Sequence, residues 1–339
     1  MQKMKRKRGA ATTWPRVLLI LAAVIAPAGG AWAAGPGWAP RKFVEISVGA
    51  GAGTPTDITV RTMAKVLKDE GLVTVPVTTI NRPGAGGELG LQALSEHPGD
   101  ARHIFIEPMN ILTNDITGKS RFTYRDFTPL AVLFSQYVAF TVKADSPLKS
   151  GMDLVNQLKK DPGSLSIAIG TTLGNSNHIA LGLLMKTAGG HLKGLKTVVF
   201  SGAAAAKTAL LGGHVDVLIS PNSGVISELK AGTVRVIGIA APHRLGGAFA
   251  GVPTWKEQGL NVVLATWRSM VGPKNLSRAQ VRYWDRTFGR MVKTREWQTY
   301  LDHIPAENGY MDSKQTAAFF RQQYGQLRAV LDALGLTKK

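Results

Sequence analysis

Short runs of apolar, β-branched residues alternate with stretches of helical spacing along most of this chain. In its first part, strands are expected at 43–48, 75–80 and 103–106, and helices at 57–67 and 86–94. A strand–helix–strand–helix–strand order is typical of a mostly parallel sheet whose faces are covered by helices. The order of these patterns therefore predicts an α/β fold.

The same alternation resumes further along the chain. Strands are expected at 165–169, 197–200, 215–219 and 234–240, and helices at 177–188 and 203–211. Between the two series lies the hydrophobic segment 130–143, which is long enough to cross from one α/β unit to the other. We therefore predict two lobes, each a helix-covered, mostly parallel sheet. Lobe 1 comprises residues 41–143 plus 265–339, and lobe 2 comprises residues 144–264.

Residues 1–33 have the pattern of a signal peptide. A basic run from Lys3 to Arg8 precedes an apolar stretch at 17–26 and the small-residue triplet Ala31-Trp32-Ala33. A membrane anchor is the alternative, but the apolar stretch is shorter than the roughly 20 residues that span a bilayer. We therefore predict export, with cleavage after Ala33.

The chain is strongly basic and lacks cysteine. It has 41 Lys and Arg against 22 Asp and Glu, which gives a formal net charge of +19. A basic surface suits nucleic acids, anionic membranes or small anions. Export argues against nucleic acid, and the basic residues are scattered rather than gathered in a stripe, so we expect a solubilising surface that steers small anions. The absence of cysteine excludes a disulfide framework, a thiolate metal site and a cysteine nucleophile.

A glycine-rich loop, residues 49–57, lies between the first strand and the first helix. Glycines let backbone amides approach a ligand, and a helix N-terminus adds partial positive charge, so a carboxylate or a phosphate would be favoured there. The loop does not match the dinucleotide-binding fingerprint, because Thr54 stands where the third glycine is needed. For Asp57 we favour the alternative role of a helix cap, which Arg61 one turn later could pair with.

A second loop of the same kind, residues 81–87, also joins a strand to a helix. Helix N-termini that follow neighbouring parallel strands meet at one edge of an open sheet, where ligands bind. The two loops together predict an anion site built from backbone amides.

Similar junctions recur in the second unit. Residues 170–178 and 200–202 again follow strands and open helices, and their hydroxyl and amide groups can bind a carboxylate. For Ser176 and Asn177 we favour the alternative, which is capping of the helix. The turn after the following strand, with Asn222, is a third candidate contact.

No catalytic pattern accompanies these loops. Gly118-Lys119-Ser120 resembles the end of a P-loop, but Thr113 stands where the earlier glycine is required. A Gly-x-Ser-x-Gly nucleophile elbow is absent, and the seven histidines have no metal-ligand spacing. We therefore predict that the protein is not an enzyme and uses no metal or cofactor.

Several blocks of sequence point to one family. The specific blocks are Asn81-Arg82-Pro83-Gly84-Ala85-Gly86-Gly87 and Val252-Pro253-Thr254. Supporting blocks are Thr56-Asp57 with Arg61, Glu257-Gln258-Gly259, Trp267-Arg268, Gly272-Pro273 and Tyr283-Trp284-Asp285. With these blocks, nearly the whole chain after the leader resembles the solute-binding proteins of tripartite tricarboxylate transporters, also called Bordetella uptake proteins.

This resemblance implies a two-lobed, type II-like periplasmic-binding-protein fold that closes on its ligand by hinge motion and delivers it to a membrane permease. The implied ligand is a small tri- or dicarboxylate such as citrate, or a related organic acid, and the implied location is the periplasm. The implied contacts lie in two loops of each lobe: Gly51, Ala52, Gly53, Thr54, Asp57, Gly84, Ala85, Gly86, Gly87, Thr171, Asn175, Ser176, Ser201 and Gly202.

The sequence departs from the family pattern in two places. Thr54-Pro55 stands where the family usually has glycine. This difference affects the geometry with which the first loop can bind a carboxylate. Residues 198–202 read Val-Val-Phe-Ser-Gly where a His-Val-Pro-Tyr-x-Gly block is common. The contacts from lobe 2 can therefore differ, and the ligand need not be citrate.

Three other roles fit parts of the pattern. The liganded protein could dock on a membrane sensor kinase instead of, or besides, a permease. An exported α/β enzyme would show turnover rather than stoichiometric binding. A cytoplasmic regulator would need a DNA-binding segment, and the basic N-terminus is too short for a helix-turn-helix, so no nucleic-acid partner is expected.

Overall fold

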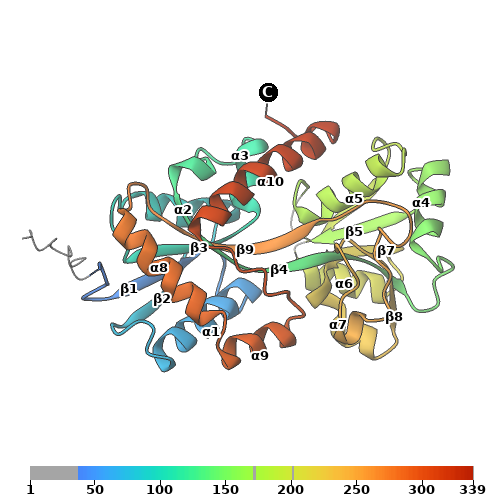
Figure 1. Ribbon diagram of the computed structural model, residues 1–339. Coiled ribbons are helices and arrows are strands. Elements are labelled where there is room, and N and C mark those ends of the chain that lie inside the picture. Colours follow the sequence, from blue (N-terminus) through green and yellow to red (C-terminus); the bar gives the residue numbers. More distant parts are fainter. Residues whose placement is uncertain (1–36, 171–172, 201, 339) are drawn as a thin grey trace, which may run out of the picture. The chain divides into compact units, whose positions relative to one another are not determined.

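The computed structural model describes residues 37–170, 173–200 and 202–338, and Figure 1 labels its elements. The predicted signal peptide, residues 1–33, lies outside the described residues. The strands are β1 (Val44–Val48), β2 (Val77–Asn81), β3 (His103–Pro108), β4 (Thr128–Lys143), β5 (Ser166–Gly170), β6 (Lys196–Phe200), β7 (Val217–Pro221), β8 (Val234–Ile239) and β9 (Ala265–Gly272).

The helices alternate with these strands. The α-helices are α1 (Pro55–Asp69), α2 (Glu88–Ser95), α3 (Asn110–Ile116), α4 (Gly151–Lys160), α5 (Ser176–Thr187), α6 (Ala203–Leu211), α7 (Ile226–Lys230), α8 (Arg278–Met291), α9 (Arg295–His303) and α10 (Ser313–Ala333). The short 3-10 helices are η1 (Ala85–Gly87), η2 (Tyr124–Asp126), η3 (Asn222–Val225) and η4 (Gly247–Phe249). None of the helices in the described ranges is both long and apolar enough to cross a membrane.

Within the described residues, the strands form one nine-stranded sheet in the order β2-β1-β3-β9-β4-β7-β5-β6, and β8 also pairs with β4. β2 and β3 both pair with β1 in parallel, and β6 and β7 both pair with β5 in parallel. β4 and β9 are antiparallel to their neighbours. The predicted α/β class is confirmed, and these two strands make the sheet mixed.

β4 joins the two halves of the sheet. Its residues up to Tyr137 pair with β9, whereas its residues from Val138 onward pair with β7 and β8. Almost all of its 16 residues are buried. A strand buried on both faces is apolar throughout, which is why it stands out as a hydrophobic segment in the sequence. We call β1, β2, β3, β9 and the part of β4 before Val138 the first half, and the remaining strands with the rest of β4 the second half.

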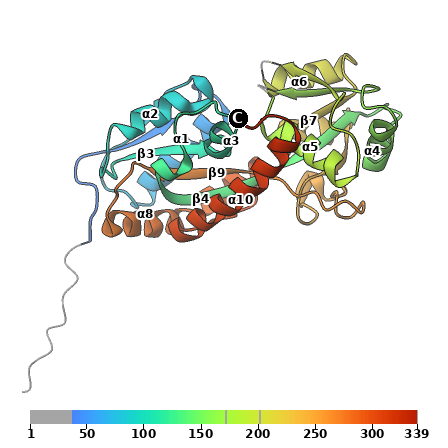
Figure 2. The same ribbon diagram turned by 90° about the horizontal axis from the view of Figure 1, so that it is seen from above.

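Helices cover the faces of both halves (Figure 1). α1, α8 and α9 pack on one face of the first half around Met63, Trp284 and Trp297. α2, α3 and α10 pack on its other face, in a core that continues beneath α4 and α5 of the second half. Figure 2 shows α10 extending from the first half toward α5, and it contacts both α3 and α5.

The alternation does not predict α3 or α4. α4 starts with a capping box formed by Ser150 and Asp153, a local signal that is present in the sequence. α3 has seven residues and no side-chain cap, and it starts directly after β3. Because it depends on burial against α10 rather than on local propensity, α3 has no comparable signal.

Candidate functional site

The first glycine loop ends at Thr54, the N-cap residue of α1. Its hydroxyl donates a hydrogen bond to the Gly51 carbonyl at 2.7 Å and accepts one from the Asp57 amide at 3.4 Å. Pro55 occupies the first turn, where a missing N–H is harmless. The prediction that Asp57 caps this helix is wrong, because the helix begins at Pro55, two residues earlier than its apolar spacing indicates.

Asp57 is buried and stabilises the first glycine loop through hydrogen bonds to its carboxylate. Its carboxylate accepts hydrogen bonds from the Gly53 amide, Arg61 Nε and Asn81 Nδ2, each at 2.9 Å. Asn81 also donates to the Ala50 carbonyl at 3.0 Å. The hydrogen bond from Arg61 is the main cause that lowers the pKa of Asp57 to about 2, so the group is ionised at neutral pH. Both oxygens therefore act inside the protein, where they tie the loop to the end of β2.

The second loop has a backbone that glycine makes possible. Gly84, Gly86 and Gly87 have positive φ angles of 136°, 65° and 103°, and Ala85 between them has a φ of 47°. Residues that carry a side chain rarely adopt a positive φ angle. The Gly86 carbonyl accepts a hydrogen bond from Asn114 Nδ2 at 3.1 Å, which attaches the loop to α3. The loop is thus held in one shape at the start of α2.

The two loops touch each other and leave amides available. A Cβ atom on Gly49 would lie 2.8 Å from the Gly87 Cα, so the backbones are as close as glycine allows. The amide nitrogens of Ala52, Ala85 and Gly86 donate no hydrogen bond to any residue that the structure describes. Three donors on two adjoining loops, beside the N-termini of α1 and α2, suit an anion.

A buried carboxyl group lies beneath the second loop. Glu107 at the end of β3 is buried, and burial raises its pKa well above the ordinary range. A Cβ atom on Gly87 would lie 3.1 Å from Glu107 Oε2. The raised pKa favours the neutral carboxyl, which offsets the positive potential of the loop amides less than a carboxylate would. Glu107 is one of the residues that the sequence motifs do not reveal.

The predicted contacts of the second half lie around the starts of α5 and α6 and in the turn after β7. Thr171 and Ser201 lie outside the described residues. Asn175 is the N-cap of α5 and accepts hydrogen bonds from the amides of Asn177 and His178, both at 3.0 Å. The expectation that Ser176 or Asn177 caps this helix is therefore wrong, and Ser176 is its first residue.

Gly202 and Asn222 complete the predicted set. Gly202 precedes α6, and a Cβ atom there would meet nothing within 4 Å. A Cβ atom on Gly170 would lie 2.9 Å from the Ala203 nitrogen, so the end of β5 is packed against the start of α6. Asn222 is buried and donates to the Pro305 carbonyl at 2.9 Å, while its Oδ1 has no partner among the described residues.

Residues of both halves line a small cavity of about 270 Å³, which includes Pro55 directly after the first glycine loop. Its lining comes from α1, β4, η3, α7, β9 and the end of α9: Pro55, Ile58, Thr59, Phe134, Gln136, Ser223, Gly224, Ile226, Arg268, Tyr300, His303 and Ile304. Elsewhere Lys119 Nζ, after α3, donates to the Leu173 carbonyl in the loop before α5 at 3.1 Å. The two halves thus meet at two places near the glycine loops.

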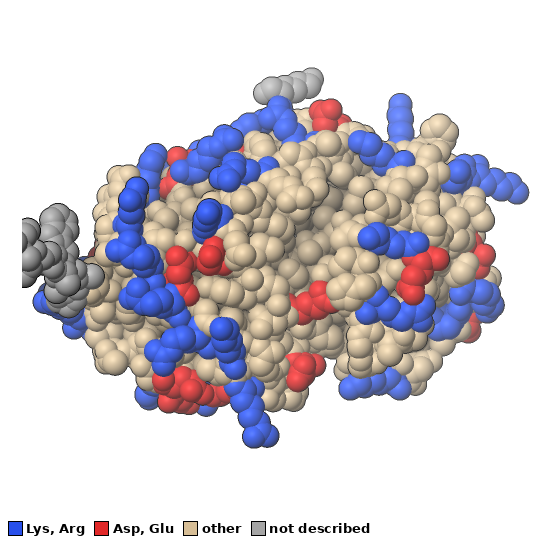
Figure 3. Space-filling model, viewed as in Figure 1, with Lys and Arg blue, Asp and Glu red and all other residues tan. Residues whose placement is uncertain are grey.

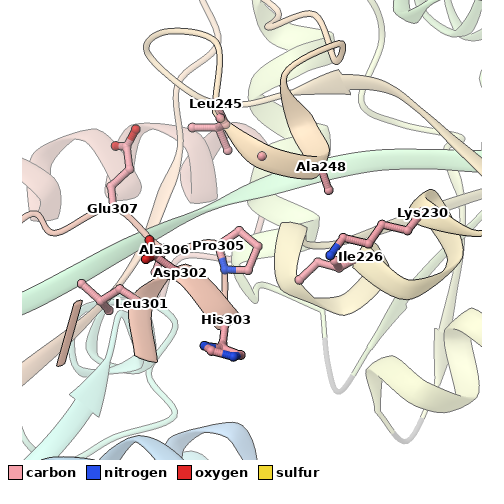
Figure 4. Close-up of a pocket in the computed structure, with 12 residues that line it drawn as sticks. Ile226, Lys230, Leu245, Ala248, Leu301, Asp302, His303, Pro305, Ala306 and Glu307 are labelled. Carbon is pink, nitrogen blue, oxygen red and sulfur yellow. The ribbon is translucent and has the colours of Figure 1, made fainter. Parts of the chain in front are cut away.

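A second cavity, of about 610 Å³, lies beside the first. Figure 4 shows Lys230 and Ile226 on one side of it and His303, Pro305 and Ala306 on the other. Glu307 at its edge accepts a hydrogen bond from the Tyr137 hydroxyl at 2.6 Å. Its other oxygen lies 2.8 Å from His243 Nε2. Segment 304–307 therefore contacts the second half close to the point where β4 changes partners.

Comparison with known proteins decides the family. The model of the tripartite tricarboxylate transporter family receptor, TctC, matches residues 60–336. The chain belongs to this family. The resemblance predicted from the glycine-loop blocks is confirmed, and receptors of this family are extracytoplasmic solute-binding proteins.

Relatives of this receptor share its length and fold. The UPF0065 protein in the gbd 5' region of Cupriavidus necator is 25% identical over 300 residues, 88% of this chain and 89% of that protein. The structure of R. palustris Rpa4515 with adipate has a TM-score of 0.75 and 21% identity, over 88% of this chain and 99% of that one. MatC (Rpa3494) from Rhodopseudomonas palustris with bound malate has a TM-score of 0.68 and 22% identity, over 88% of this chain and 100% of that one.

The surface of the receptor carries one basic row. Arg278, Arg282, Arg286 and Arg290 follow one another at every fourth position of α8, and all four are exposed. Figure 3 shows Lys and Arg side chains along this helix. None of the four pairs with an acidic side chain in the described residues. The expectation that basic residues form no stripe is wrong for α8, because a spacing of four places side chains on one helical face.

Arg268 is the second residue that the motifs do not identify as a contact. It lies in the apolar run of β9. The sequence block Trp267-Arg268 indicates the family but does not indicate a ligand contact. The described residues contain no group of His, Cys, Asp or Glu side chains that could hold a metal ion. The candidate site of this receptor is therefore a set of backbone amides, hydroxyls and one arginine between the two halves of the sheet.

Proposed function

We propose that this receptor binds a small di- or tricarboxylate between the two halves of its sheet. The observation that carries the proposal is a group of amides, at Ala52, Ala85 and Gly86 on two loops in contact, that donate no hydrogen bond within the described part of the chain. A carboxylate can accept several hydrogen bonds from such amides, and bonds to a charged acceptor are stronger than those to a neutral one. The proposed ligand therefore places one carboxylate at these loops, and the loops of the second half enclose the remainder.

The solved relatives support this ligand class. Rpa4515 is seen with adipate and MatC with bound malate, and both share the fold of this chain. Adipate and malate are both dicarboxylates. We extend the same class to this receptor, with Gly202, Ser176 and the neighbouring loops as its contacts in the second half.

Closure on the ligand is proposed to use the crossing between the two lobes. β4 changes partners between Tyr137 and Val138, and the chain returns to the first half where β9 begins at Ala265. A few residues at such junctions can absorb the change in backbone angles when two lobes close. The lobes predicted from the sequence, residues 41–143 plus 265–339 and residues 144–264, would then move about these two strands.

The proposed role is delivery of the captured acid to the membrane subunits of a tripartite tricarboxylate transporter. We also propose export through the leader at residues 1–33, so that the receptor works in the periplasm. We propose binding without turnover, which is supported by the receptor family to which the chain belongs.

Thermal unfolding of the protein without residues 1–33 tests the proposal. A ligand that binds only the folded state at about 100 times its Kd stabilises it by about 2.7 kcal/mol. For a chain of this size, this raises Tm by several degrees. The panel comprises citrate, aconitate, dicarboxylates, acidic amino acids and aromatic acids. A saturable rise with one class of acid supports the proposal, and a rise only with uncharged solutes refutes it.

A further inference from the structure

Arg268 has an unsatisfied charge in the cavity between α1 and η3. Its Nε atom is buried and has no hydrogen-bond partner among the described residues. Nη1 donates to the Trp267 carbonyl at 3.3 Å, and no carboxylate of the described residues lies within ion-pair distance of the guanidinium. A buried charge without a counter-charge is costly, so such a group is usually matched by an ion.

The neighbours of Arg268 do not neutralise it. No Asp or Glu is among the residues that line the cavity. Glu107 precedes the residue that pairs with Arg268 on β3; burial raises the pKa of its carboxyl, and the charge of Arg268 partly counteracts this effect. Successive side chains on a strand point to opposite faces, so Glu107 and Arg268 also lie on opposite faces of the sheet. Among the described residues, Arg268 therefore has no carboxylate in the cavity as an ion-pair partner.

The cavity has room for a carboxylate and a short apolar chain. Its volume of about 270 Å³ compares with about 30 Å³ for one water molecule in the liquid. Tyr300 and Thr59 share a hydrogen bond of 2.6 Å at its wall, and Phe134 and Ile58 supply apolar surface. Ile58 is about half exposed, as expected for a wall that a ligand would cover.

The cavity adjoins the first glycine loop in the chain. Thr54 ends that loop, and the next residue, Pro55, lines the cavity. The first glycine loop thus leads directly into the wall of the cavity that Arg268 also lines. A ligand with one carboxylate at the loops can reach into the cavity with the other end of its chain.

We infer that Arg268 binds the second carboxylate of the ligand and makes the receptor selective for dicarboxylates over monocarboxylates of the same length. This inference rests on the proposed function. Arginine suits the task because its planar fork can donate two parallel hydrogen bonds to one carboxylate. Arg268 is then a residue that determines specificity, whereas the glycine loops supply the general affinity for carboxylates.

Isothermal titration calorimetry on the protein without residues 1–33 tests this inference. The probes are succinate, glutarate and adipate, each matched with butyrate, pentanoate or hexanoate. The wild-type protein should bind its preferred dicarboxylate at least about tenfold more tightly than the matched monocarboxylate. Arg268→Gln should weaken the dicarboxylate by about 10- to 100-fold and leave the monocarboxylate within about twofold. Arg268→Lys, which keeps the charge without the fork, should recover part of the loss.

Two controls distinguish the loss of the Arg268 contact from a change in net charge and from a loss of folding stability. Arg286→Gln removes one exposed positive charge from α8 and should leave both affinities unchanged, which excludes a general effect of net charge. Without ligand, Arg268→Gln should have a Tm equal to or above that of the wild type, because it removes an unpaired buried charge.

The outcomes also separate this inference from the proposed function. If the wild type binds dicarboxylates and Arg268→Gln binds them equally well, the role of Arg268 is refuted while carboxylate binding stands. The same holds if the variant loses both members of a pair equally. If the wild type binds none of these acids nor any other carboxylate, the proposed function fails as well.

Discussion

Replacing Asp57 with asparagine should loosen the first glycine loop. The side chain keeps its size but loses its charge and one of its acceptor oxygens. The wild-type carboxylate accepts hydrogen bonds from Gly53, Arg61 and Asn81, and asparagine cannot accept all three. The loop should then lose part of its attachment to β2, and the affinity for the ligand should fall with it.

The cost in stability can be worked out from the pKa of Asp57. The folded protein lowers this pKa from its ordinary value of 3.8 to about 2. A difference of this size corresponds to at most about 2.5 kcal/mol of unfolding free energy. Arg61, the main partner, is more than half exposed, so solvent screening reduces the contribution and we expect about 1 kcal/mol.

The sign of the pH dependence follows from the direction of the shift. A carboxylate with a lowered pKa in the folded state contributes its full stability above its unfolded pKa of 3.8, and this contribution disappears as the pH falls toward about 2. Urea unfolding of the wild type and Asp57→Asn should therefore differ by about 1 kcal/mol at neutral pH, with the two converging near about pH 2. A difference that is the same at every pH would refute the electrostatic explanation.

Three further variants test other parts of the structure. Gly86→Asp should abolish ligand binding. Its matched control is Gly189→Asp, because Gly189 has the same φ of 65° as Gly86. Equal affinity of the two variants in calorimetry would refute a contact at Gly86. Gly238→Ala would place its Cβ 2.7 Å from the Trp255 ring and should lower the unfolding free energy by about 1–3 kcal/mol. An unchanged urea midpoint would show that the ring can move aside. Arg286→Glu should raise stability by about 0.5 kcal/mol at low salt, because it turns repulsion along α8 into attraction, and should lose this gain at high salt. A gain that is independent of salt would contradict that reason.

Local patterns carried much of the prediction. The hydrophobic run of β4, the helical spacing of α1 and the glycine loops at 49–57 and 81–87 depend on residues close together in the chain. Backbone propensity and burial act on such neighbours directly, so the α/β class and the family could be recognised from the sequence. The positive φ angles at Gly84, Gly86 and Gly87 agree with the reading of the second loop as a backbone that glycine permits.

Contacts between distant residues could not be predicted in this way. The Thr59–Tyr300 and Asn222–Pro305 hydrogen bonds join residues 241 and 83 positions apart, and no periodicity indicates either. The same is true of Arg268, which in the sequence is one polar residue within a strand.

The sequence by itself determined which segments become strands, helices and glycine loops, because these depend on neighbouring residues. Only the tertiary structure decided that Asp57 acts inside the first loop, that Glu107 is buried beneath the second, and that Arg268 lines a cavity with no acidic residue in its described lining. Burial and electrostatics depend on which distant segments fold against a residue, and these set the chemistry of the site.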